Sequence, residues 1–239
     1  MVAKFSIRLL DRVEQMRPLA ELLASVWQMP VDQSELSPDL LRALAFTDNY
    51  VAGAFVGDDL VGGAVGFWGS DTDGPVLHSH VTGVVSGMYG TGVGFALKQH
   101  QREWTLARNV ARITWTFDPL VRRNAYFNLV KLGAYFDQYH ESFYGEMLDP
   151  INAGDQSDRV VAVWDFRNAG ATADGANGTD MISIAVPEDI VALRATDPAS
   201  SLKWRHRTRA QFQAAFANGY RATSITKAGE YQLTRAAGR

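Results

Sequence analysis

Four glycines fall within eight residues, at positions 87, 90, 92 and 94, between a predicted strand and a predicted helix. The strand covers residues 81–85, and the helical spacing of apolar residues begins at Phe95. Glycines let the backbone approach a ligand closely, and the amides that begin a helix favour negative charge. The segment predicts either a phosphate-binding turn or a glycine-rich turn without a ligand.

Two common phosphate-binding motifs do not fit this turn. A Walker A loop needs Lys followed by Ser or Thr directly after its last glycine, whereas Phe95 follows Gly94. A dinucleotide-binding turn needs the spacing G-x-G-x-x-G, which Gly90, Gly92 and Gly94 do not have. A third kind of phosphate loop, or a purely structural turn, is left.

The hydrophobic pattern of residues 1–167 predicts strands and helices in an order typical of an α/β protein. The predicted strands are 5–9, 50–56, 60–68, 76–85, 112–117, 134–139 and 159–166, and the predicted helices are 13–27, a short one that begins at Ser37-Pro38, 95–108 and 122–132. Hairpin strands followed by strand–helix units predict a mixed central sheet flanked by helices.

Charge divides the chain into two parts. Residues 1–180 carry 14 Lys and Arg against 22 Asp and Glu, whereas residues 181–239 carry 9 against 4, so the second part is basic within a net charge of −3. Residues 168–180 lack large apolar side chains and predict a flexible linker. We therefore expect an α/β domain at 1–167, a linker at 168–180 and a basic α+β extension at 181–239. In the extension we expect a strand at 181–186, a helix at 199–218 and strands at 222–226 and 230–234.

Composition excludes several classes of protein. The chain has no cysteine, which removes disulfide frameworks and thiol nucleophiles and fits a cytoplasmic location. No apolar run approaches the roughly 20 residues that span a bilayer, and the first ten residues do not resemble a signal peptide. The net charge of −3 gives no reason to expect nucleic-acid binding. We expect neither a membrane nor a nucleic acid as a partner, and a homodimer is compatible with the sequence.

The glycine turn resembles the pyrophosphate loop of the GNAT acyltransferase superfamily, whose motif is Gln/Arg-x-x-Gly-x-Gly/Ala. The matching residues are Tyr89-Gly90-Thr91-Gly92-Val93-Gly94, with Tyr89 in place of Arg or Gln. A bacterial subfamily of predicted GNAT acetyltransferases is more similar still. Its ordered motifs correspond to Leu77-His78-Ser79-His80, Thr114-Trp115-Thr116-Phe117-Asp118-Pro119-Leu120, Asn124-Ala125, Lys131-Leu132-Gly133, Phe143-Tyr144-Gly145 and Ser157-Asp158-Arg159. The turn at 85–91 departs from the Pro-Glu-Tyr-Arg-Gly-Arg type of that subfamily.

The resemblance implies the GNAT fold and an acyl-CoA cofactor, acetyl-CoA or succinyl-CoA. It places the pantetheine arm along the backbone of Val84 and Val85 and the pyrophosphate on the amides of residues 90–94. It also implies that Asn124 contacts the pantetheine and that Lys131 lies near the ribose phosphate, although a solvated lysine at a helix end is equally compatible.

Transfer to an amine needs a base for the ammonium proton and an acid for the leaving thiolate. His78 and His80 share one face of a strand, and His80 is the predicted base. The alternatives are a core histidine beside a surface histidine, or a His-x-His metal pair, which lacks a third ligand at motif spacing. Leu129 occupies the position where many family members have the tyrosine acid, so Tyr126 is the nearest candidate.

Acceptor binding has four candidates, each of which has an alternative structural explanation. Asp118 and Arg159 are candidates that could also be a loop cap and an ion-pair partner. Arg205 and Arg209 lie beside a predicted core stripe of one helix and could bind a carboxylate or simply form a solvated basic face.

These features together predict an N-acyltransferase that transfers an acetyl or succinyl group from CoA to a primary amine of a small molecule or amino acid. The transfer would be direct, in a ternary complex, and no metal is expected. The alternative is a GNAT-fold protein that binds CoA or a partner without catalysis, as Tyr89 and Leu129 suggest.

Overall fold

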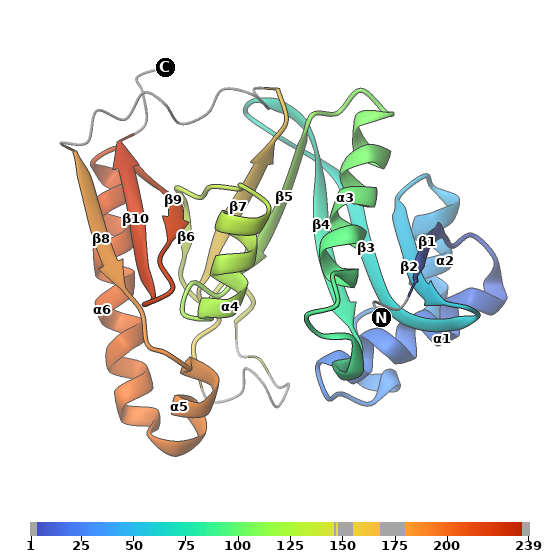
Figure 1. Ribbon diagram of the computed structural model, residues 1–239, viewed down its shortest axis with the longest axis horizontal. Coiled ribbons are helices and arrows are strands. Elements are labelled where there is room, and N and C mark those ends of the chain that lie inside the picture. Colours follow the sequence, from blue (N-terminus) through green and yellow to red (C-terminus); the bar gives the residue numbers. More distant parts are fainter. Residues whose placement is uncertain (1–3, 146, 148–154, 168–179, 236–239) are drawn as a thin grey trace. The chain divides into compact units, whose positions relative to one another are not determined.

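The computed structural model of the protein describes residues 4–145, 147, 155–167 and 180–235 (Figure 1). The chain is an α/β protein and forms two compact units, residues 1–113 and residues 114–239, which we call unit 1 and unit 2. Residues 168–179 of the linker predicted at 168–180 lie outside the described residues.

Unit 1 is an antiparallel sheet with helices on both faces. Its elements are β1 (Ser6–Leu9), α1 (Val13–Val26), η1 (Val31–Gln33), α2 (Pro38–Phe46), β2 (Tyr50–Val56), β3 (Asp59–Asp71), β4 (Gly74–Val84), η2 (Ser86–Met88) and α3 (Val93–Leu106). The strand order is β1-β2-β3-β4, with each neighbouring pair antiparallel. The helix predicted at Ser37-Pro38 is confirmed, because the Ser37 hydroxyl caps α2 by accepting the Leu40 amide at 3.2 Å.

Small residues in β3 let helices approach the sheet from both sides. A Cβ added at Gly63 would lie 2.2 Å from Leu19 of α1, whereas one at Gly62 would lie 3.2 Å from Val93 of α3. Successive strand residues point to opposite faces, so α1 and α3 cover opposite faces of the sheet. On the α1 side of the sheet, buried side chains of the strands and of the covering helices, Leu19 among them, form the apolar core of this unit.

Unit 2 contains two small groups of strands. Its elements are β5 (Arg112–Phe117, which begins at the end of unit 1), α4 (Arg122–Ala125), η3 (Tyr126–Lys131), β6 (Tyr139–His140), β7 (Arg159–Asp165), β8 (Met181–Ala185), α5 (Ile190–Thr196), α6 (Pro198–Ala217), β9 (Tyr220–Ile225) and β10 (Glu230–Arg235). One group has the order β5-β7-β6 and the other the order β8-β10-β9.

An aromatic cluster joins the C-terminal elements to the middle of the chain. Phe136 lies at its centre, and its ring contacts four other rings at centroid distances of 5.5–5.9 Å, those of Phe117, Phe212, Phe216 and Tyr231. The Tyr231 hydroxyl donates to the Pro119 carbonyl at 2.6 Å, and Phe136 exchanges two backbone hydrogen bonds with Ala222 of β9. Residues 181–235 therefore share a core with residues 114–167, and the predicted boundary at 168–180 does not coincide with the division between the compact units.

Three sequence-based expectations differ from the structure. The helix expected at 122–132 is one α-helical turn, α4, followed by the π-helical turn η3, where the Leu132 amide donates to the Phe127 carbonyl at 3.0 Å. In place of the strand expected at 134–139, the structure has the short strand β6 and an isolated bridge between Tyr135 and Val163. The helix α5 was not predicted, although the Asp189 carboxylate caps it.

Candidate functional site

The glycine turn follows β4 directly and leads into α3. The Met88 amide donates to the Val85 carbonyl at 2.9 Å, and the Thr91 hydroxyl donates to the Met88 carbonyl at 2.7 Å, so the turn is held by its own backbone. Gly90 has a φ of 75° and Gly92 a φ of 94°, in the left-handed region that favours glycine. Two of the glycines are thus required by the path of the chain.

The glycines of this turn leave the backbone open where the chain enters α3. A Cβ added at Gly87, Gly90 or Gly92 would meet no heavy atom within 4 Å, so the backbone faces open space there. Gly92 caps α3, and the first amides of a helix have no carbonyl partner within it. With the helix dipole, these amides favour a phosphate or pyrophosphate. The residues therefore fit the pyrophosphate of CoA, while the Tyr89 side chain is 61% exposed beside them.

The histidine pair lies on the same strand, β4, before the turn. The rings of His78 and His80 have centroids 6.3 Å apart, and the Phe67 ring contacts both, at 5.1 and 5.6 Å. Burial, with smaller contributions from His80 and Lys98, lowers the pKa of His78 to about 4. Burial also lowers the pKa of His80, against the opposing influence of Glu35. Both imidazoles are neutral at pH 7, as a general base must be.

A buried lysine lies next to these histidines and was not singled out in the sequence. Lys98 of α3 is 5% exposed, and its ammonium donates to the Ser79 hydroxyl at 2.7 Å and to the Gln101 side-chain oxygen at 3.4 Å. Burial lowers the pKa of Lys98 to about 7. Ser79 lies between the two histidines in sequence, so the lysine holds the strand segment that carries them. No local sequence pattern distinguishes this lysine from an exposed one.

In unit 2, two of the predicted acceptor-binding residues belong to a buried ion-pair cluster. Arg205 is fully buried and forms two hydrogen bonds of 2.8 Å with Asp118 and two with Asp155, of 2.7 and 3.3 Å. Arg194 pairs with the same two carboxylates. Burial raises the pKa of Asp118, but the two arginines outweigh it and lower this pKa to about 2. The alternative structural explanation therefore fits Asp118 and Arg205 better than acceptor binding, because the carboxylate and the guanidinium are already paired with each other.

The other two predicted acceptor-binding residues are also paired, but one is partly exposed. Arg159 donates to the Asp158 carbonyl at 2.9 Å and lies over the Tyr144 ring at 5.4 Å. Arg209 pairs with Asp158 at 2.8 Å and with Glu141 at 2.9 Å, and its side chain is 14% exposed. Of the three arginines in the prediction, Arg209 is the most exposed.

The remaining predicted residues lie along α4 and η3. Asn124 and Lys131 are exposed, and Tyr126 is half-buried with the Lys131 ammonium 6.0 Å from its ring centroid. Leu129 is 3% exposed and packs into the core. The structure thus brings Tyr126 and Lys131 together on one helical segment.

Two kinds of site are not found in the described part of the chain. It holds no group of three or more His, Cys, Asp or Glu side chains arranged to bind a metal ion. None of its helices combines the length and the apolar composition needed to cross a bilayer.

No protein-family model matches the chain, and no curated protein sequence matches it. Solved structures do match. A GNAT-family acetyltransferase from Desulfovibrio desulfuricans is 11% identical with a TM-score of 0.51, over 68% of this chain and 99% of its own. An aminoglycoside 6'-acetyltransferase type Ii is 15% identical with a TM-score of 0.51, over 67% and 97%. Arabidopsis thaliana Naa50, in complex with the bisubstrate analogue CoA-Ac-MVNAL, is 19% identical with a TM-score of 0.50, over 68% and 99%.

These similarities cover nearly the whole of each solved structure and about two thirds of this chain. At such low identity they concern the backbone and leave the substrates open. The expected fold class is confirmed: the protein has the fold of the GNAT acetyltransferases.

Proposed function

We propose that the protein is a member of the GNAT superfamily that transfers an acyl group from acyl-CoA to a primary amine. The observation that carries the proposal is the open glycine turn at the start of α3, because the backbone amides of this helix N-terminus can bind a pyrophosphate. The bound complex of Naa50 with a CoA analogue, a protein of the same fold, supports this assignment.

In this proposal the amides of Gly90, Gly92, Val93 and Gly94 hold the pyrophosphate, and the backbone of Val84 pairs with the pantetheine arm. The expectation is corrected for Thr91 and Val85, because the Thr91 amide donates to the Met88 carbonyl at 3.4 Å and the Val85 amide donates to the Val61 carbonyl at 3.0 Å. Tyr89 supplies no cationic side chain at this position, so the affinity depends on the amides and the dipole of α3. Asn124 and Lys131, exposed on the α4–η3 segment, contribute polar contacts to the cofactor. Acyl-CoA, when bound, supplies an acyl group activated as a thioester.

His80 is the proposed general base. Its neutral imidazole accepts a proton from the ammonium group of the acceptor, and the free amine that results attacks the thioester carbonyl. Tyr126 is the proposed proton donor to the leaving thiolate. Lys98 acts on this base indirectly, because its hydrogen bond to Ser79 fixes the neighbouring residue of β4.

The proposed acceptor is the primary amine of a small molecule or an amino acid, and the acyl group is acetyl or succinyl. An aminoglycoside acetyltransferase and a peptide-bound acetyltransferase both have this fold, which shows that acceptor classes vary within it. Arg209 is the arginine proposed to meet a carboxylate of either substrate, because it is the most exposed of the three.

A second function is favoured by one observation. Leu129 occupies the position of the family tyrosine and is buried in the core, so this segment has no hydroxyl there. A protein that binds acyl-CoA without turnover is the alternative. Release of free CoA across a panel of amines distinguishes a transferase from this alternative.

Calorimetry with acetyl-CoA and with succinyl-CoA tests the binding site. Gly92→Ala adds a side chain to the open turn, and we expect it to weaken binding about ten-fold or more. The matched control is Gly57→Ala in the β2–β3 hairpin, another glycine of positive φ whose added Cβ would meet nothing within 4 Å. Both variants lose similar stability, but the control keeps its affinity. Failure of the wild-type protein to bind either thioester would exclude the proposed function.

The pH profile of turnover tests the base. We expect His80→Ala to lower kcat about 10²- to 10⁴-fold. Since burial lowers the pKa of His80 from 6.5, the wild-type rate falls on acidification only below pH 6.5. The matched control is His206→Ala, which removes an exposed imidazole from α6. An unchanged rate and an unchanged acidic limb in His80→Ala would assign the base elsewhere.

A further inference from the structure

In the strand order of the described sheets, β1, β6, β8 and β9 are the terminal strands, and three of these four carry features that oppose pairing with another chain. An unprotected edge is a template for a further strand, which proteins block with charge, bulges, short length or a cover. β1 is four residues long and contains Arg8, and β6 has two residues. β9 contains Arg221 and is covered at Ala222 by the backbone of Phe136.

The fourth edge strand, β8, has none of these features. Its five residues, Met181-Ile182-Ser183-Ile184-Ala185, include no charge, no proline and no glycine. Its pairing with β10 is regular along its whole length, without a bulge. Two of its apolar side chains are exposed, Met181 by 57% and Ile182 by 36%. Among the described strands, β10 is its single neighbour.

The backbone of β8 directs alternate residues toward this free edge. The Val186 amide donates to the Gly229 carbonyl at 2.9 Å, on the β10 side. In an antiparallel ladder the backbone groups of successive residues point alternately to the two sides. Residues 182 and 184 therefore bond to β10, and the amides and carbonyls of Met181, Ser183 and Ala185 face the free edge.

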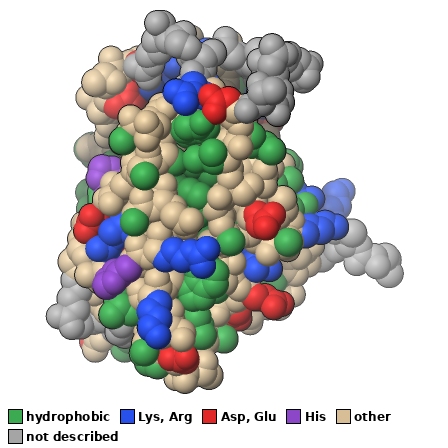
Figure 2. Space-filling model, turned by 90° about the vertical axis from the view of Figure 1, so that its left-hand side faces the viewer, with side chains coloured by type: hydrophobic (Ala, Val, Ile, Leu, Met, Phe, Trp, Pro, Cys, Tyr) green, Lys and Arg blue, Asp and Glu red, His purple; other side chains and the backbone are tan. Residues whose placement is uncertain are grey.

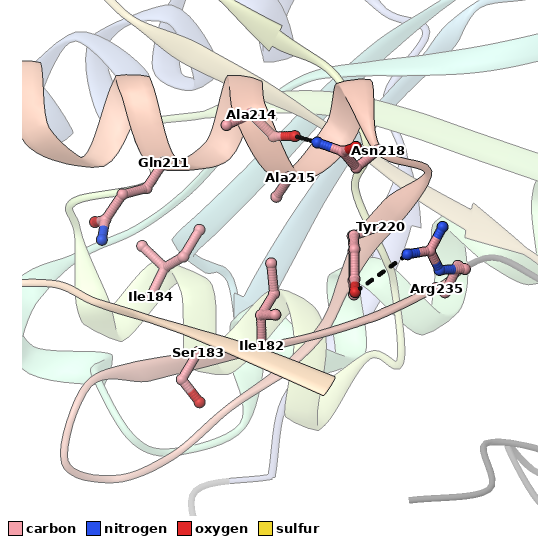
Figure 3. A pocket seen from close by; sticks show the side chains of 9 residues that line it. All are labelled: Ile182, Ser183, Ile184, Gln211, Ala214, Ala215, Asn218, Tyr220 and Arg235. Carbon is pink, nitrogen blue, oxygen red and sulfur yellow. Dashed lines mark hydrogen bonds between the residues drawn. The ribbon is translucent and has the colours of Figure 1, made fainter. Parts of the chain in front are cut away.

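A groove runs along the same edge. It has a volume of about 460 Å³ and lies between β8 and α6, lined by Ile182, Ile184, Gln211, Ala214, Ala215 and Asn218 among others. Figure 3 shows Ile182 and Ile184 pointing from the strand toward the helix, whereas Ser183 points away from it. The small alanines of α6 leave this space open. Figure 2 shows a band of hydrophobic side chains on the side of Figure 1 where β8 and α6 lie.

The geometry points to β8 as the interface with a second copy of this chain, whose β8 adds antiparallel to the free edge. With a two-fold axis beside Ser183, each Ser183 pairs with its counterpart, and Met181 pairs with the partner's Ala185. These are the residues whose backbone groups face the edge, so all of them gain hydrogen-bond partners. The next pairs set Ile182 against the partner's Ile184, on the face where the groove lies.

A second copy fits this edge better than another partner because the surface is complementary to itself. The same five residues supply both strands, and none of them is charged, so no like charges face each other across the two-fold axis. The two-fold axis also limits the assembly to two chains. The partner's isoleucines fill the groove that α6 leaves beside Ile182 and Ile184. A strand from a different protein would need to match this apolar pattern independently.

The test is the mass of the full chain in solution, by sedimentation equilibrium from about 1 to 100 μM. We expect the wild-type protein to form a dimer. Ser183→Pro removes an amide that faces the free edge and leaves the backbone hydrogen bonds between β8 and β10 intact, and strands tolerate proline at such a position. Both Ser183→Pro and its control lose the hydrogen bond that the Gln232 side chain donates to the Ser183 hydroxyl at 3.2 Å. The matched control is Ser183→Ala, which removes the hydroxyl and keeps the amide. We expect the proline variant to be monomeric, with its dimer dissociation constant raised at least ten-fold, and the alanine variant to remain dimeric.

Circular dichroism of each variant at low concentration shows whether it folds. If Ser183→Pro does not fold, Met181→Lys takes its place, with Phe46→Lys of α2, at a side chain 77% exposed, as its control. A monomeric wild-type protein over the whole range would overturn the proposal, and binding of a different protein's strand at β8 would then be the remaining use of the edge. Equal dimerisation of Ser183→Pro and Ser183→Ala would place the interface elsewhere and would overturn it as well.

Discussion

Two buried cations, Lys98 in unit 1 and Arg205 in unit 2, have different surroundings. In unit 1, the ammonium of Lys98 donates to a hydroxyl and a side-chain amide, both neutral. In unit 2, the guanidinium of Arg205 lies between two carboxylates, those of Asp118 and Asp155, which it shares with Arg194. Lysine can lose its proton when it is desolvated, whereas arginine retains its charge.

This difference decides how each unit responds to perturbation. Lys98 can lose its proton instead of remaining a buried charge. The stability of unit 1 therefore depends on pH between the lowered pKa of Lys98, about 7, and its unfolded value of 10.5. Arg205 keeps its charge, so the stability of unit 2 depends on the carboxylates that neutralise it. Three measurements can break or sharpen this contrast.

The largest effect is expected from Asp118→Asn. The substitution removes a carboxylate that two buried arginines share, and breaking a buried ion pair in this way costs about 3–5 kcal/mol. Urea unfolding at pH 7 measures the loss. A loss below about 1 kcal/mol, the value typical of exposed pairs, would show that the cluster is solvated and that the contrast is wrong.

Lys98→Met tests the other half of the contrast through pH. The native pKa of about 7 lies below the unfolded value of 10.5, so between these limits the unfolded state binds one more proton. Stability of the wild-type protein therefore rises with pH across this window, by up to about 1.4 kcal/mol per pH unit. The methionine variant lacks this rise, and its advantage over wild type is largest below pH 7.

Urea unfolding of both proteins from pH 6 to 10 gives the difference directly. The matched control is Lys203→Met, because Lys203 is exposed on α6 and keeps its hydration. A difference between wild type and Lys98→Met that is constant with pH would mean that Lys98 stays protonated in the native protein.

The smallest effect is expected from Asp48→Asn. Asp48 pairs with Arg108 at 2.7 Å, but the carboxylate is 68% exposed and the guanidinium 32% exposed. Solvent screens such a pair, so the loss is below about 1 kcal/mol. The same urea titration measures it. A loss as large as that of Asp118→Asn would show that the presence of an ion pair, rather than its burial, sets the cost.

Local signals in the sequence predicted most of the elements, because those elements are determined by neighbours in the chain. Ser37 caps α2 and Gly133 follows the helical segment with a φ of 73°, as helix-end chemistry requires. The glycine turn was found for the same reason. The antiparallel hairpin of β2 and β3 likewise followed from the turn between two apolar runs.

The role of Arg205 could not be found in this way. It lies next to Trp204 in a helix whose predicted core stripe was Trp204, Thr208, Phe212 and Phe216, but the buried face is rotated to include Ser201, Arg205, Thr208, Phe212 and Ala215. The carboxylates that make its burial favourable are 87 and 50 positions away in the chain. Lys98 escaped notice for a similar reason, since its partner Ser79 lies 19 positions away on a strand.

The long-range contacts of unit 2 have a consequence for how the chain folds during synthesis. Arg205, the partner of Asp118, is synthesised 87 residues later, and Tyr231, the partner of Pro119, is synthesised 112 residues later. At about 5–20 residues per second, the ribosome supplies these partners several seconds after residues 114–136 emerge. Unit 1 has all of its strands by then and can close first, whereas Phe136 stays exposed to solvent or to chaperones until β10 appears. Slow, late closure of unit 2 follows from a core built of contacts so distant in sequence.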